Sequence, residues 1–218
     1  MTATPAPAPP TTGTARIASF FSDMELRRRR REDGARPAPG AERHRGAFLF
    51  LDMVAFTRLG EQLGEQGVKG AEVLSEILHA HYRPILATIR GHGGDVLFFA
   101  GDALGVIWLA EDDDLAEAAA RAAACGLAVQ ALAATIRSAA SRPLAFRASL
   151  GVGGVEAFEV GGLDGAWMQL VRGEAVELAC RADARGEGGA LVLPERCAAH
   201  LADHGAAFTP LGDGHLRL

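Results

Sequence analysis

Apolar and polar residues follow two different periods along this chain, and two of its apolar runs lead to an aspartate. The run at 47–51 ends directly at Asp52, and the run at 96–100 is followed by Gly101 and Asp102. Five consecutive apolar residues would not lie in solvent, so the first run predicts a buried strand. Another apolar run, at 103–108, follows Asp102. A Gly-Asp pair between two apolar runs is typical of a hairpin turn with an exposed carboxylate. The pattern therefore places an aspartate at each of two strand ends.

The remaining pattern mixes helical and strand periods. Apolar residues at helical spacing predict helices over 55–65, 67–90, 114–140 and 174–184. Alternation and short apolar runs predict strands over 103–108, over 146–152 with its continuation over 155–160, and over 167–171 and 190–193. The order β-α-α-β-β-α-β-β-α-β predicts an α+β fold, with helices packed on a mainly antiparallel sheet.

One predicted helix, over 114–140, has a narrow stripe of small and apolar residues. The stripe consists of Leu115, Ala119, Ala122, Gly126, Val129 and Ile136. Three aspartates at 112–114 precede it, and aspartate is favoured at a helix N-terminus. We interpret this helix as part of the core and not as a cofactor site.

The N-terminal segment differs in composition from the rest of the chain. Residues 1–16 are mostly Pro, Ala and Thr, so we expect disorder there. Helical spacing of apolar residues predicts a short amphipathic helix over 15–31 that docks on the domain. Its basic end, Arg27–Arg31, is interpreted as a solvated face because acidic residues follow it directly. We therefore divide the chain into an N-terminal segment, 1–45, and one domain, 46–218.

Composition argues against several classes of function. The chain has 218 residues with 49% hydrophobic content, enough for one domain with a substantial core. A net charge of −5 does not favour nucleic acid as a partner, because phosphate backbones require a basic face. No uninterrupted apolar run approaches the ~20 residues of a membrane span, and the N-terminus lacks a signal-peptide pattern. A cytoplasmic location is expected.

The two aspartates suggest metal chemistry. Mg²⁺ and Mn²⁺ prefer carboxylate oxygens and usually take one or two protein carboxylates together with substrate phosphates. Two adjacent strand ends would supply such a pair at Asp52 and Asp102. The alternative is that each is a solvated turn residue. Because a helix start follows Asp52, the pattern favours a two-metal phosphoryl-transfer site.

Several stretches, in order, carry a likeness to a known family: FLDMVAFT (50–57), GAEVLSEILHAHYRPILATIRGHGGD (70–95), GGDVLFFAGDALGVIW (93–108), LGVGG (150–154) and VRGEAVELACRADARGEGGALVLPERC (171–197). They resemble the catalytic domain of class III adenylyl and guanylyl cyclases. In particular they resemble the first of the two catalytic halves of soluble, bicarbonate-responsive adenylyl cyclases and bacterial relatives. The resemblance covers about 46–218 and implies a ferredoxin-like core with extensions.

The resemblance also implies roles for individual residues. In the family, two aspartates hold two divalent cations, Mg²⁺ or Mn²⁺, and cyclisation of a nucleoside triphosphate expels pyrophosphate. The metal site then falls on Asp52, Met53 and Asp102. Arg181 joins the two aspartates as a catalytic residue that stabilises charge developing at phosphate. The implied enzyme is a dimeric signalling protein with ATP as the expected nucleotide.

The residues after Asp52 predict a phosphate-binding helix start. Amides in the first turn of a helix lack intrahelical partners, and the helix dipole favours an anion there. Val54, Ala55, Phe56 and Thr57 occupy this position. Ala55 stands where the family usually has glycine, so we expect a right-handed backbone at this residue.

Two departures from the family pattern affect the site. Phe98 stands where the family has a lysine that contacts the adenine edge, and a phenyl ring stacks on a base without discriminating polar groups. Glu177 stands where an asparagine orients the ribose, and its charge would hinder triphosphate binding. First catalytic halves share these substitutions, so the resemblance implies half of a composite site. A complementary cyclase domain or a second copy of the chain would be the partner.

Three hypotheses follow. The first is a catalytic half of a nucleotidyl cyclase. The second is a silent cyclase-homology module that binds nucleotide or a partner cyclase domain for regulation. The third rests on Gly93-Gly94-Asp95-Val96, which superficially resembles the Gly-Gly-Asp-Glu-Phe hairpin of diguanylate cyclases. The two strand-end aspartates favour the first hypothesis, and the missing lysine and asparagine favour the second.

Overall fold

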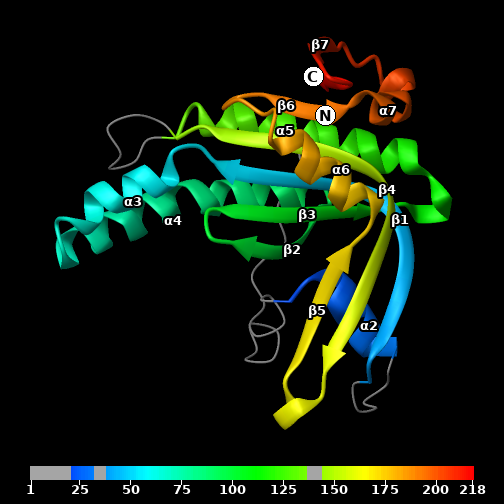
Figure 1. Cartoon of the computed structure of the whole chain (residues 1–218), viewed down its shortest axis with the longest axis horizontal. Coiled ribbons are helices and arrows are strands. Elements are labelled where there is room, and N and C mark those ends of the chain that lie inside the picture. The colour runs from blue at the N-terminus through cyan, green and yellow to red at the C-terminus, as the bar shows by residue number, and fades with distance from the viewer. Residues whose placement is uncertain (1–20, 32–37, 137–143) are drawn as a thin grey trace.

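The computed structural model describes residues 21–31, 38–136 and 144–218, and it shows a sheet of eight strands with helices packed on it (Figure 1). The strands are β1 (Gly40–Met53), β2 (Asp95–Ala100), β3 (Ala103–Leu109), β4 (Phe146–Gly161), β5 (Trp167–Arg172), β6 (Leu191–Pro194), β7 (Thr209–Gly212) and β8 (His215–Arg217). Their order across the sheet is β2-β3-β1-β4-β6-β8-β7, and β5 pairs with β4 beside this path. Only the β4–β6 pairing is parallel among the described strands, so the predicted α+β fold with a mainly antiparallel sheet is confirmed.

The two faces of the sheet bury different side chains, because successive residues of a strand point to opposite faces. The helices are α2 (Asp23–Arg31), α3 (Phe56–Gly64), α4 (Val68–Gly91), α5 (Leu115–Ala133), α6 (Glu174–Asp183) and α7 (Glu195–Ala198). Leu49 and Leu51 of β1 belong to a large cluster that includes residues of α4 and α5. Phe48 lies on the other face, in a smaller cluster with Met24 of α2 and with α6. The core therefore has two layers, one on each side of β1.

β1 is longer than the sequence pattern predicts. β1 begins at Gly40, before the predicted domain start at residue 46, because its first residues pair with the far half of β4. β4 runs continuously from Phe146 to Gly161, so the predicted strand continues through Gly153 and Gly154 as expected. The first half of β1, the second half of β4 and β5 extend from the rest of the sheet as an arm (Figure 1). The division into domains otherwise stays a prediction.

α5 is the predicted core helix. The Asp114 side chain accepts a hydrogen bond from Glu117 N at 3.0 Å and caps its start. The predicted stripe is buried from Leu115 to Val129, and Ile136 is buried beyond the end of the helix. Among the described helices, α5 alone is long and apolar enough to cross a membrane by length and composition. Because its buried face packs against β1 and β4, we interpret it as a core helix.

α2 docks on the sheet, as predicted, and residues 15–20 of the predicted helix lie outside the described residues. Met24 is only 5% exposed and packs in the Phe48 cluster. The amides of Asp23 and Met24 each donate a hydrogen bond of 2.8 Å to the Asp95 carboxylate on β2. Burial raises the pKa of Asp95, and these two hydrogen bonds oppose that rise. Asp95, part of the segment that resembles a diguanylate cyclase hairpin, thus has a structural role at the start of α2.

The basic end of α2 is not simply a solvated face, which corrects the interpretation from sequence. Arg28 Nη1 lies 2.8 Å from Glu159 Oε2, and Arg29 Nη2 lies 2.9 Å from Glu159 Oε1. Glu159 is on the arm and is only 2% exposed. A buried carboxylate requires paired charge and hydrogen bonds, so these two arginines are what make its burial possible.

Replacing Glu159 with glutamine should release α2 from the arm. Tryptic cleavage at Arg28 and Arg29 should become at least about tenfold faster, because breaking a buried ion pair typically costs about 3–5 kcal/mol. Cleavage rates at individual arginines are measured by mass spectrometry of the digest. Glu156→Gln is the matched control, since Glu156 pairs with Arg43 and Arg172 and not with α2. Equal protection of Arg28 and Arg29 in both variants would contradict the prediction.

Candidate functional site

Asp52 and Asp102 lie beside each other at one end of the sheet. Asp52 is near the end of β1 and is paired with Ala103, the first residue of β3. Asp102 directly precedes Ala103 and lies in the turn between β2 and β3. Gly101 has φ +67°, a left-handed conformation that glycine adopts easily and that closes this turn. Both carboxylates act electrostatically on the same two groups, Tyr82 and Arg147. The structure thus brings together the two aspartates that the sequence pattern singles out.

Tyr82 of α4 lies against this pair, although the sequence analysis did not select it. Its hydroxyl donates a hydrogen bond of 2.8 Å to the Asp102 carbonyl oxygen. Burial, and then the negative charges of Asp102 and Asp52, raise the pKa of Tyr82 to about 12. α4 buries the preceding residue, His81, so the helical period gives no signal for Tyr82.

The titration of Tyr82 tests this arrangement directly, because it is the only tyrosine in the chain. Tyrosinate absorbance should report a pKa of about 12 in the folded protein, against a usual value of 10.0. Since the folded state holds this proton more tightly, the stability that it contributes is complete below pH 10 and is lost as the pH rises toward about 12. Asp102→Asn should lower the Tyr82 pKa, whereas the exposed control Asp203→Asn should leave it unchanged. Circular dichroism confirms that the chain is folded at each pH, and an ordinary pKa in the folded wild type would contradict the prediction.

Arg147 and Asp183 complete a polar cluster with Asp52, Asp102 and Tyr82. The sequence pattern did not predict either of them as a site residue. Arg147 Nε donates to Asp52 Oδ2 at 3.1 Å, and Arg147 Nη2 contacts the same oxygen. The hydrogen bonding to Asp52 is the main reason that the pKa of Arg147 is raised. Asp183, the last residue of α6, lies 3.9 Å from Arg147 Nη2. Burial raises the pKa of Asp183, and across this distance the attraction to Arg147 does not compensate.

The cluster fits a divalent cation that arrives with a ligand. Within the described residues, no group of three or more His, Cys, Asp or Glu side chains is arranged to hold a metal by itself. Two carboxylates are nevertheless the usual protein contribution to a Mg²⁺ site that is completed by phosphate oxygens. Met53 has a side chain buried in the core, so only its carbonyl oxygen is a candidate ligand. Arg147 competes for Asp52 in this arrangement.

The helix start after Asp52 differs from the prediction at two residues. Ala55 has φ 63° and ψ 20°, so its backbone is left-handed and not right-handed as expected. This conformation costs energy for any residue with a Cβ, and it explains why glycine suits the position. Val54 N donates a hydrogen bond of 2.8 Å to Ala145 O, which removes this amide from a phosphate site. Phe56 and Thr57 precede the first intrahelical hydrogen bond, from Leu59 N to Ala55 O, so their amides remain candidates.

Phe98, the predicted base-pocket residue, lies on β2 and is 36% exposed. The centroid of its ring is 6.2 Å from that of Phe48. The ring also covers Gly105, where an added Cβ would be only 2.5 Å from it. Phe98 thus forms an apolar surface next to the smaller cluster, with one side accessible to a stacking partner.

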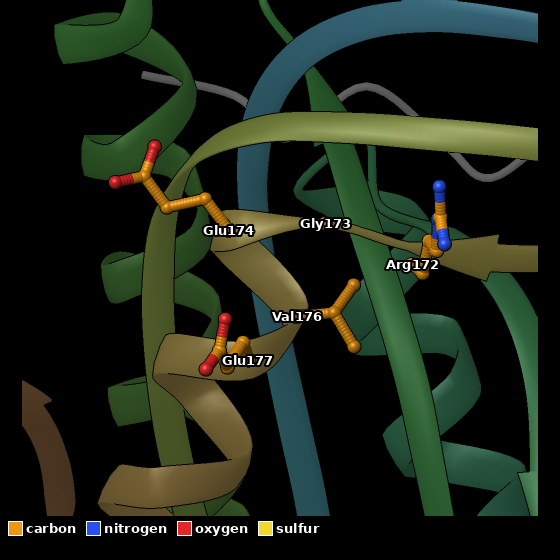
Figure 2. Close-up of a pocket in the computed structure, with 5 residues that line it drawn as sticks. All are labelled: Arg172, Gly173, Glu174, Val176 and Glu177. Atoms are coloured by element: carbon orange, nitrogen blue, oxygen red, sulfur yellow. The ribbon is translucent and has the colours of Figure 1, made fainter.

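Glu177 and Arg181 face solvent on α6. They form an i,i+4 ion pair, and their side chains are 61% and 70% exposed. Within the described residues Arg181 pairs with Glu177 and not with Asp52 or Asp102, so this chain does not assemble all three predicted catalytic residues. Glu177 also lines a cavity of about 440 Å³ together with Arg172, Gly173, Glu174 and Val176. Figure 2 shows the two glutamates on α6 and Val176 pointing away from them.

Comparison with known proteins gives partial sequence matches and a match of fold over most of the chain. No family model matches the chain. It is 35% identical over 89 residues to adenylate cyclase type 10 of Homo sapiens, and 32% identical over 96 residues to that of Oryctolagus cuniculus. These matches cover 40% and 43% of this chain but only 6% of each relative. The chain therefore corresponds to a small part of these curated proteins.

Solved structures extend the likeness to most of the chain. The adenylyl cyclase CyaB from P. aeruginosa has a TM-score of 0.64 at 19% identity, covering 82% of this chain and 93% of its own. The guanylate cyclase domain of RhGC from Catenaria anguillulae, solved with GTP, has a TM-score of 0.65 at 18% identity, covering 81% and 95%. A dimeric guanylyl cyclase domain of RhoGC from Blastocladiella emersonii has a TM-score of 0.64 at 16% identity, covering 83% and 97%. This chain therefore has the fold of the class III adenylyl and guanylyl cyclase catalytic domains, and over part of its length it resembles adenylate cyclase type 10 in sequence.

Proposed function

We propose that this chain is a nucleotidyl cyclase domain that converts a nucleoside triphosphate, ATP first among the candidates, into a 3′,5′-cyclic nucleotide and pyrophosphate. The observation that carries the proposal is the placement of Asp52 and Asp102 at adjacent strand ends of a cyclase fold. A domain with only a structural role has no physical reason to gather two partly buried carboxylates around one tyrosine and one arginine. The proposed location is the cytoplasm, where nucleoside triphosphates are abundant.

Each residue of the site then has a task. Asp52 and Asp102 would hold two divalent cations, Mg²⁺ or Mn²⁺, which supply charge neutralisation at the triphosphate and activation of the 3′-hydroxyl. The amides of Phe56 and Thr57 bind phosphate oxygens at the start of α3. Arg147, once free of Asp52, offers a planar fork of donors to the same phosphates. In the reaction the 3′-oxygen bonds to the α-phosphorus as the bond to pyrophosphate breaks.

The site is one half of a composite site in this proposal. Phe98 offers the base a stacking surface without a polar donor, and Glu177 holds Arg181 in an ion pair instead of orienting a ribose. A partner domain would supply the lysine and the asparagine that the family uses at these two positions. Such a partner is a complementary cyclase domain.

A second candidate function is a regulatory module that binds nucleotide or a cyclase partner without catalysis. Two observations favour it. The Arg147 guanidinium is hydrogen-bonded to the Asp52 carboxylate, where a cation would bind. Glu177 adds negative charge on the surface near the start of α6. The two functions differ in one measurable respect. A catalytic half gives cyclic nucleotide when it is mixed with a complementary domain, and a silent module does not.

The proposal is tested first by binding. Calorimetry of the full chain with Mn²⁺ and a nucleoside triphosphate analogue that is unable to cyclise should show binding that depends on the metal. The same titration in the presence of a chelator should show none, because the carboxylates and the triphosphate repel each other without a cation. Metal-independent binding, or no binding at all, would contradict the metal site.

Base selection by this half should be weak, because the phenyl ring of Phe98 rewards stacking by any purine. ATP and GTP analogues should bind within about tenfold of each other, or about 1.4 kcal/mol. Phe98→Ala should weaken both by a similar factor. A much larger preference for one base would show that other groups select it.

A further inference from the structure

The Arg147 guanidinium lies between two carboxylates, one held closely and the other just beyond hydrogen-bond distance. We propose that Asp183 is a positioning residue that receives Arg147 when a divalent cation takes Asp52. The inference rests on the proposed function, because it requires a cation at Asp52. It gives a role to Asp183, a residue that the sequence analysis did not select.

Arg147 obstructs Asp52 in the structure. Its Nε is 3.1 Å from Asp52 Oδ2, and its Nη2 contacts the same oxygen. The Asp52 side chain is only 15% exposed, and Oδ2 is the oxygen that the guanidinium contacts. A divalent cation and a guanidinium repel each other, and both require the same carboxylate oxygens. Cation binding therefore requires Arg147 to leave Asp52 Oδ2.

Asp183 is placed to accept the displaced guanidinium. Its Oδ2 lies 3.9 Å from Arg147 Nη2, so a movement of about 1 Å would make a hydrogen bond. Its Oδ1 is buried and has no hydrogen-bond partner among the described residues. An unpaired buried carboxylate oxygen is costly, and a second donor from the guanidinium fork would satisfy it.

The two residues differ in freedom of movement. Asp183 ends α6, and its carbonyl oxygen accepts a hydrogen bond of 2.9 Å from Gly186 N, so its backbone is held. The Arg147 side chain is 37% exposed and has a long flexible stem. Arg147 is therefore the part that moves. When one edge of the Arg147 guanidinium is hydrogen-bonded to Asp183, its other N–H groups remain available to a phosphate oxygen.

The test is a double-mutant cycle on Mn²⁺ binding to the full chain, measured by calorimetry in the presence of a nucleoside triphosphate analogue that is unable to cyclise. Asp183→Asn should lower the Mn²⁺ affinity about fivefold, because the displaced Arg147 loses its charged acceptor. In an Arg147→Gln background the same change should have almost no effect, because no guanidinium has to be received. Asp183→Glu, which keeps the charge, should restore most of the affinity.

The possible outcomes separate the inference from the proposed function. An equal loss in both backgrounds would overturn the inference and leave the metal site intact, since it would show only a long-range effect of charge. Unchanged affinity in Asp183→Asn would do the same. Absence of Mn²⁺ binding by the wild-type chain would remove the metal site and the inference together. If Asp183→Asn does not fold, the Arg147 Nε–H signal in nitrogen-15 NMR gives the answer. It should move on saturation with Mg²⁺ and the triphosphate analogue, and a stationary signal would overturn the inference.

Discussion

Replacing Asp102 with alanine should abolish metal-dependent nucleotide binding. We expect a loss of at least about a hundredfold in affinity for the Mn²⁺ complex of a triphosphate analogue, or about 2.8 kcal/mol. The physical reason is that a Mg²⁺ or Mn²⁺ site with two protein carboxylates loses half of its protein ligands with one substitution. Because Asp102 lies in a turn and its contact with Tyr82 runs through the backbone carbonyl, the fold should be retained.

Asp52→Asn should give a loss of similar size by the same measurement. Asparagine is the better replacement here, because it keeps an oxygen for Arg147, whereas alanine would leave that guanidinium without its main partner. Asp203→Ala is the matched control, since Asp203 is exposed and does not belong to the cluster. Wild-type binding in the Asp52 or the Asp102 variant would show that the replaced aspartate is not a metal ligand.

The isolated chain should form very little cyclic nucleotide, even if it dimerises with itself. A symmetric dimer would repeat both aspartates, but each protomer would contribute Phe98 and Glu177 and neither would contribute a base-reading lysine or a ribose-orienting asparagine. Losing a positioning group and a polar donor at the transition state lowers the rate by a factor on the order of a thousand or more.

The measurement is production of cyclic AMP and cyclic GMP by the purified chain with Mn²⁺, before and after addition of a cyclase domain that carries the lysine and the asparagine. Turnover should appear on mixing and should disappear again with Asp102→Ala in this chain. Strong turnover by the chain alone, lost in Asp102→Ala, would make it a self-sufficient cyclase. No turnover on mixing, with intact nucleotide binding, would favour the regulatory module.

The secondary structure could be predicted from the sequence because it depends on local periods. The helices over 55–65, 67–90 and 174–184 and the strand over 167–171 agree with the observed elements within one residue at each end. The stripe on α5 is buried as predicted, because small and apolar side chains that repeat every 3.6 residues form one face of the helix, and this face packs against the sheet. Asp52 and Asp102 were also accessible to this reasoning, because each interrupts or ends an apolar run.

The rest of the site depends on contacts between residues far apart in the chain. Arg147 alternates with apolar neighbours on β4 and looks like a solvent-facing residue. It becomes part of the site only because β4 pairs with β1 and places it opposite Asp52, 95 residues away. The backbone conformation of Ala55 likewise follows from how β1 passes into α3, which the side chain alone would disfavour.

What the sequence by itself determined is therefore the set of elements, the two strand-end aspartates and the absence of a lysine and an asparagine at the matching positions. These properties belong to single segments, whose periodicity and composition are visible without a partner. The tertiary structure alone decided the burial of Glu159 beneath Arg28 and Arg29, and the gathering of Tyr82, Arg147 and Asp183 around Asp52. A polar side chain is costly to bury unless its partners are in place, and only the folded sheet, with α2, α4 and α6 against it, brings those partners together.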